Sequence, residues 1–131
     1  MALKLEDQLT SFELSKKLKE LGVKQDSLFC WTSDIDLEYL PTDIRNNNSC
    51  IAAFSVAEHG EMLPKEINGY IYTQIPNSDE DKWIVFYLLD ERPLFINGKL
   101  VSFSDYKEAD ARAKMRIYLL ENGLITNDKQ N

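Results

Sequence analysis

One stretch of the chain, Lys82–Leu89, limits the possible folds more than any other. Side chains of a β-strand alternate between two faces, and both faces of this stretch are apolar. One face would carry Trp83, Val85, Tyr87 and Leu89, and the other Ile84, Phe86 and Leu88. Such a strand belongs in the middle of a sheet, with both faces covered. We expect helices to cover both, unless a second copy of the protein covers one.

Alternating apolar residues and turn signals predict the other strands. These strands are expected at 27–32, 34–40, 69–75, 94–96 and 100–103. Asn97-Gly98, between the last two, is typical of a tight type I′ hairpin turn. Apolar residues at helical spacing predict helices at 11–21, at 56–63 and from Asp105 to Asn122-Gly123.

Three pairs of residues have the spacing of a capping box, in which each side chain of the pair bonds the other residue's backbone N–H at a helix start. They are Thr10 with Glu13, Ser55 with Glu58, and Asp105 with Glu108. Each pair stands at the start of one predicted helix, so we expect all three to act as caps.

Together these elements predict an α+β fold. We expect residues 1–131 to form one domain, with an antiparallel sheet of about 4–5 strands packed by the first and last helices and a short middle helix. The ends, 1–8 and 126–131, are expected to fray, and 42–49 has the composition of a loop.

Charge and composition exclude several functions. The 131 residues carry a net charge of −7, which argues against nucleic-acid binding because phosphate contacts need clustered Lys and Arg. No apolar run reaches the roughly 20 residues of a membrane helix, and no leader is evident. We therefore expect a cytoplasmic protein that binds no membrane. Cys30 and Cys50 are expected to be small buried residues; a disulfide between them stays open.

His59 is the only histidine, and it stands between two acids, Glu58 and Glu61. Such a group could serve as a general base or as part of a ligand site. The simpler expectation is a surface histidine on a short helix. A zinc site needs three or four protein ligands, so one histidine does not make one. The sequence therefore assigns no catalytic residue, no cofactor and no metal, and leaves an enzyme or ligand-binding domain near His59 as the alternative.

A protein-binding surface is the leading functional hypothesis. Six residues are the candidates: the aromatic Tyr70, Tyr72 and Trp83, and the acidic Asp34, Asp36 and Glu38. The aromatic residues would form an exposed apolar patch, and the acidic residues would attract a basic partner. The partner would be another protein or a second copy of the chain. An acidic mimic of DNA is a further alternative, for which the net charge is small.

Two segments, Val56–Pro64 and Glu108–Ile125, resemble parts of small uncharacterised proteins found in bacterial prophages and mobile elements. Lys17–Gly22, followed by an aromatic strand, is similar to the same group. The likeness runs through most of the chain in order and is weakest at Pro41–Ser49 and Glu91–Ser102. It implies a phage or mobile-element origin, and it transfers no activity and no site residue.

Overall fold

A computed structural model describes residues 5–33, 35–39 and 50–125 of the chain. Its helices are the 3-10 helix η1 (Leu5–Gln8) and the α-helices α1 (Phe12–Glu20), α2 (Val56–Met62) and α3 (Glu108–Glu121). The 3-10 helix η1 lies within the predicted frayed end at 1–8. The predicted loop at 42–49 and the predicted frayed end at 126–131 lie outside the described residues.

The described strands form three antiparallel sheets. The first contains β1 (Phe29–Trp31), β2 (Leu37–Tyr39) and β3 (Ile51–Ala52), in the order β2-β1-β3. The second contains β4 (Glu66–Ile67), β5 (Tyr70–Asn77), β6 (Lys82–Leu89), β7 (Arg92–Pro93) and β10 (Ser102–Asp105). The third is the hairpin of β8 (Phe95–Ile96) and β9 (Lys99–Leu100). The α+β class is confirmed, although the strands are divided among several sheets instead of lying in one.

The prediction for β6 is confirmed for its central position and for the cover of one of its two faces. It is a central strand, paired with β5 on one side and with β10 on the other. Its Val85 and Tyr87 are completely buried in a cluster that includes Ala111, Met115 and Leu119 of α3. The opposite face has no such cover from the described residues, since the neighbouring Ile71 of β5 is 58% exposed. The expectation that helices cover both faces is wrong.

The turn at Asn97-Gly98 is confirmed. Both residues have positive φ, 52° for Asn97 and 81° for Gly98, as a type I′ turn requires. The flanking strands pair Phe95 with Leu100 and Ile96 with Lys99. The turn residues alone therefore set the register of this hairpin.

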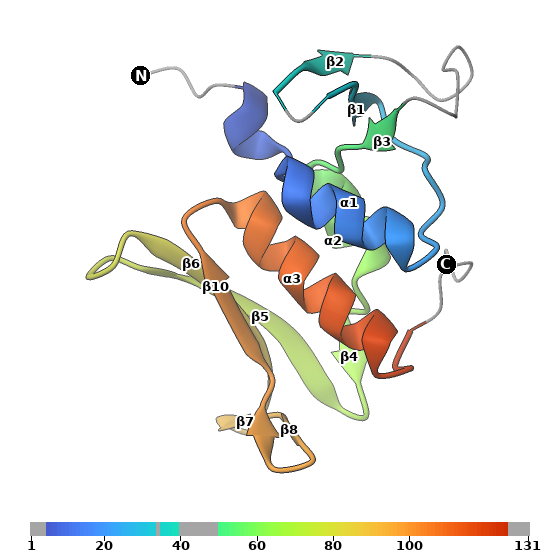
Figure 1. Cartoon of the computed structure of the whole chain (residues 1–131). Helices are drawn as coiled ribbons and strands as arrows, with labels where there is room; N and C mark the ends of the chain where they lie inside the picture. Colours follow the sequence, from blue (N-terminus) through green and yellow to red (C-terminus); the bar gives the residue numbers. More distant parts are fainter. Residues whose placement is uncertain (1–4, 34, 40–49, 126–131) are drawn as a thin grey trace.

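Helix α3 contributes to two hydrophobic cores. Ala111, Met115 and Leu119 join the cluster on the sheet, while Ala113 and Ile117 join a second cluster on α1. In Figure 1, α3 runs between α1 and the strands β5, β6 and β10. The alanines leave room on both sides of the helix because their side chains are a single methyl group.

Two of the three predicted capping boxes are wrong. α1 starts after Ser11 and α3 after Lys107, and neither N-cap side chain bonds its helix. The box of Ser55 and Glu58 at α2 is confirmed in both directions. Strands β3 and β4 were not predicted, because they span two residues each and leave no alternating pattern.

We predict that Ala113→Leu destabilises the protein by about 1–3 kcal/mol, because Ala113 is fully buried where α3 meets α1 and a larger side chain forces the helices apart. Urea denaturation measures the loss. Glu121→Leu on the same helix is the control; it removes an exposed ion pair with Lys17 and should change the stability by no more than about 0.5 kcal/mol. Equal stability of both variants would contradict the packing described.

Candidate functional site

His59 is placed by a confirmed capping box. The Ser55 hydroxyl accepts a hydrogen bond from the Glu58 amide at 3.2 Å, and the Glu58 carboxylate accepts one from the Ser55 amide at 2.8 Å. This fixes the first turn of α2 and directs the next side chain, His59, into the protein. The expected surface histidine is wrong, because His59 is 0% exposed.

The two contacts of the His59 ring define its protonation. Arg116 lies 3.1 Å from Nδ1, and since a guanidinium only donates, Nδ1 must be the acceptor. The Thr10 hydroxyl lies 2.5 Å from Nε2, and it donates its own hydrogen to the Phe54 carbonyl at 2.8 Å. Nε2 is therefore the donor to Thr10. Both contacts select the neutral ring with its proton on Nε2.

Electrostatics agree with a neutral ring. Burial lowers the pKa of His59 well below its ordinary 6.5, and the positive charges of Arg116 and then Arg112 lower it further. The same arrangement acts on the arginine. Burial lowers the pKa of Arg116 to about 10, while the Glu58 carboxylate raises it, so Arg116 keeps its charge at neutral pH.

Arg116 is only partly satisfied by hydrogen bonds. Its side chain is buried with the guanidinium carbon 4.9 Å from the centre of the Phe54 ring, a cation–π contact. One Nη donates to His59, while the buried Nε has no hydrogen-bond partner among the described residues. The Phe54 ring and the neutral His59 imidazole are thus the partners of the buried Arg116 charge.

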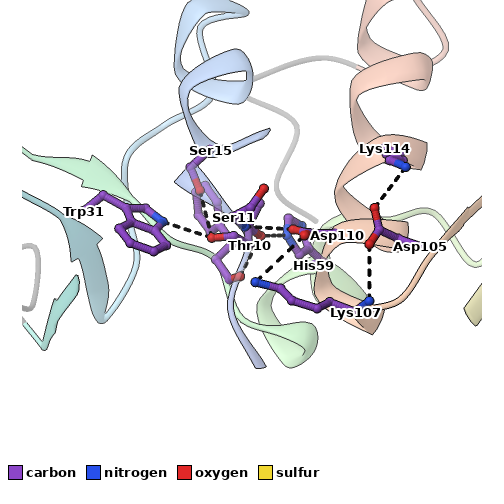
Figure 2. A network of polar contacts seen from close by, with 10 residues as sticks. Thr10, Ser11, Ser15, Trp31, His59, Asp105, Lys107, Asp110 and Lys114 are labelled. Carbon is purple, nitrogen blue, oxygen red and sulfur yellow. Dashed lines mark hydrogen bonds and ion pairs between the residues drawn. The ribbon is translucent and has the colours of Figure 1, made fainter. Parts of the chain in front are cut away.

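Thr10 connects His59 to Ser15 and Trp31 in the rest of the core (Figure 2). Its backbone carbonyl accepts hydrogen bonds from the Trp31 indole at 3.0 Å and from the Ser15 hydroxyl at 3.3 Å. Its side chain is occupied by Phe54 and His59, which explains why Thr10 does not cap α1 as predicted. We call Thr10, Ser15, Trp31, His59 and Arg116 the polar core.

Asp110 performs the capping that the sequence pattern assigned to Thr10 and Glu13. Its carboxylate accepts a hydrogen bond at 2.8 Å from the amide of Ser11, the residue that precedes α1. Lys107 lies 3.8 Å from the same carboxylate. Burial raises the pKa of Asp110 above 3.8, against the opposing effects of Ser11 and Lys107.

The third predicted capping pair, Asp105 with Glu108, also bonds other residues instead of capping its helix. The Asp105 carboxylate pairs with Lys114 at 3.0 Å, and Glu108 pairs with Arg112 at 3.1 Å. Arg112 further donates to Gln74 of β5 and to the Val56 carbonyl of α2. These bonds attach α3 to the sheet and to α2, which is why they take precedence over capping.

The His59 ring has no nitrogen available to react with a substrate, because both nitrogens are engaged within the polar core. The lone pair of the His59 ring faces Arg116 and its N–H faces Thr10, so neither nitrogen is available to a substrate. Glu58 is committed to its cap and to the Ser27 hydroxyl, and Glu61 is exposed on α2. The structure therefore does not bring Glu58, His59 and Glu61 together as a site.

The six candidate surface residues also lie apart. Tyr70, Tyr72 and Trp83 are half-buried against the α3 side of the large sheet. Asp36 and Glu38 are exposed near and on β2 of the other sheet, and Asp34 lies outside the described residues. The tyrosines and the tryptophan are core residues and not an exposed patch.

Burial raises the pKa of Tyr72 to about 12, and its hydroxyl donates to Gln74.

The exposed apolar surface lies on the opposite face of the same sheet. Residues paired across antiparallel strands share a face. The pairs are Ile71 with Leu88, Thr73 with Phe86, Ile75 with Ile84, Ser102 with Phe86, and Ser104 with Ile84. We call these eight residues the outer sheet face. Ile71 is 58% and Ile75 45% exposed, while Ile84, Phe86 and Leu88 are partly exposed.

The sequence held the signal for this surface. Strict alternation in 69–75 separates Ile71 and Ile75 from the two tyrosines, and therefore predicts two faces of different composition. Alternation does not show which face the helix covers. Aromatic size suggested the wrong one, because the tyrosines and Trp83 fill the space beneath α3.

A cavity of about 360 Å³ lies beside α2. Its lining residues are Gly60, Leu63, Pro64, Lys65, Ile71, Tyr72 and Arg112. A methyl group added at Gly60 would come within 2.6 Å of an Arg112 nitrogen, so glycine makes room for this arginine. None of Glu58, His59 and Glu61 lines the cavity.

Further searches add negative results. Among residues 5–33, 35–39 and 50–125, no three His, Cys, Asp or Glu side chains gather as metal ligands. None of the helices in the same ranges has the length and apolar character to cross a membrane. Cys30 and Cys50 are both buried and are not joined by a disulfide. Comparison with protein families, curated proteins and solved structures finds no match to this chain.

We predict that the His59 ring stays neutral in the folded protein as the pH falls below 6.5, with its proton on Nε2. Nitrogen-15 NMR of this single histidine measures both properties. In urea the His59 ring should titrate near 6.5, so unfolding takes up a proton below that pH. The free energy of unfolding therefore falls as the pH is lowered below 6.5, by up to about 1.4 kcal/mol per pH unit. A folded-state midpoint at 6.5 or above would contradict the buried contacts.

We predict that Thr10→Val lowers the free energy of unfolding by about 1–3 kcal/mol. Valine keeps the shape of threonine but leaves the His59 N–H buried without a partner, and the Phe54 carbonyl keeps only the backbone amide of Thr10 as its donor. Urea denaturation at pH 7.5 measures the change. The control, Thr32→Val, removes an exposed hydroxyl 3.3 Å from the Asp36 carbonyl and should cost less than about 0.5 kcal/mol. Similar losses for both would remove the case for a polar core.

Proposed function

We propose that the protein is a non-enzymatic, protein-binding accessory protein that acts in the cytoplasm through its outer sheet face. The observation that carries this proposal is the exposed position of Ile71 and Ile75 beside Ile84, Phe86 and Leu88. Soluble monomers rarely expose a continuous apolar patch of this kind, and such patches commonly mark interaction sites. A phage or mobile-element origin is proposed on the resemblance of Val56–Pro64 and Glu108–Ile125.

The closed polar core favours binding over catalysis. A perturbed histidine is commonly a sign of an active site, because catalytic groups need shifted pKa values. Here the shift accompanies complete burial and two fixed partners, which gives His59 a structural role. An enzyme with its site at Glu58, His59 and Glu61 would require a rearrangement of α2.

Site-directed photo-crosslinking in the host cell tests the proposed function. A photoreactive amino acid at position 71 should form a covalent adduct with a protein, because Ile71 is the most exposed isoleucine of the outer sheet face, at 58%. Position 28 is the matched control, since Leu28 is apolar and 49% exposed but lies outside this sheet.

The adduct at position 71 should disappear when Ile75→Lys is introduced, because the added charge lies on the same face. No adduct at position 71 above the level at position 28 would contradict a protein-binding role for this face. Mass spectrometry of the adduct identifies the bound protein.

A further inference from the structure

We propose that the protein bound to the outer sheet face is a second copy of this chain, packed face to face with its strands antiparallel to those of the first. The inference rests on the proposed function and names the partner of the same surface. Three features support it: the uncharged centre of the face, the positions of the charges at its ends, and its size.

The centre of the outer sheet face has no charged side chain. Between the ends of β5 and β6 it carries only isoleucine, leucine, phenylalanine, threonine and serine. A surface of this kind is compatible with itself, because stacking two copies buries no unpaired charge. Stacked sheets about 10 Å apart interdigitate such side chains.

The charges at the two ends are opposite. Glu66 is paired with Ile71 and so lies on the outer face at one end. Lys82 is paired with Asn77 and lies on the outer face at the other end, where it also contacts Glu80 of the adjoining turn at 3.8 Å. A two-fold axis in the interface and across the strands reverses the ends of one copy relative to the other. Lys82 of each copy then lies at the same end as Glu66 of the other. The alternative axis, along the strands, would place like charges together.

The dimensions suit a small isologous interface. Strand β5 has eight residues, which at ~3.4 Å per residue gives a length of roughly 27 Å. At ~4.8 Å per strand, β5 and β6 give roughly 10 Å of width over this full length, and the shorter β10 and β4 extend the width to roughly 19 Å over part of it. This footprint suits the apolar centre of an interface that buries about 800 Å² per partner, with Glu66, Asn77 and Lys82 at its polar rim.

The net charge of −7 does not oppose this contact locally. Within the paired strands, the outer sheet face and its rim carry one acid, Glu66, and one base, Lys82, and Lys82 also offsets the charge of Glu80 in the next turn at 3.8 Å. The acidic excess of the sequence lies mainly at 34–66, and much of it belongs to the sheet of β1, β2 and β3 or to α2. Repulsion between distant surface charges is screened beyond about 8 Å at physiological salt.

Light scattering coupled to size exclusion, on the full chain at micromolar concentration, tests the dimer. We expect a mass near twice the 15.2 kDa of one chain. Ile71→Lys should raise the dissociation constant at least about 30-fold, because it places a charge on the apolar face that the dimer would bury. Leu28→Lys, an equally drastic change at an exposed apolar residue elsewhere, should leave the mass unchanged. Circular dichroism confirms that both variants are folded.

Charge reversal tests the antiparallel arrangement. Lys82→Glu and Glu66→Lys should each raise the dissociation constant about tenfold, and the double variant should restore it to within about threefold of the original. If the double variant instead dissociates more readily than either single variant, so that the two losses of affinity add, the antiparallel arrangement is overturned.

The results separate the two proposals. A mass of one chain at every concentration, or a dimer unaffected by Ile71→Lys, overturns the second copy as the partner. If position 71 then crosslinks to a different protein, the proposed function stands without the dimer. If neither a dimer nor an adduct is found, both proposals fail.

Discussion

The structure depends on the burial of α3 on two opposite sides. One side of the helix completes the core on the large sheet, and the other completes the core on α1. A helix in this position has little surface left for its polar residues. Asp110, Arg112 and Arg116 therefore find most of their partners inside the protein, at the start of α1, on α2 and on β5, while the Arg116 Nε has none among the described residues.

These contacts explain the polar groups of the interior. Asp110 receives the amide that begins α1, Arg112 joins α2 to β5, and Arg116 lies on Phe54 beside His59. An unpartnered buried charge is strongly destabilising, so these contacts position α3 as firmly as the apolar packing does. His59 contributes an acceptor that has no charge of its own, which is the suitable partner for a buried guanidinium next to a second arginine.

Local features were predictable from sequence, and long-range ones were not. The central strand at 82–89, the Asn97-Gly98 turn and the cap of Ser55 with Glu58 depend on residues close together in the chain. Thr10 contacts a residue 49 positions away, and Ser11 contacts one 99 positions away. No short-range pattern shows that these partners replace the expected capping bonds. The same limit applies to the sheet, where alternation defined two faces but not the one that receives α3.

Sharing one helix between two cores has a further consequence for how the protein opens. If α3 detaches, the hydrophobic cluster on the sheet and the one on α1 are exposed to water at the same time, so neither cluster stays buried without this helix. The chain then behaves as a single cooperative unit, and the slowest-exchanging backbone amides of β6 and of α1 open with the same free energy. Substitutions in α3 must satisfy two sets of neighbours at once, which narrows the sequences that this helix accepts during evolution.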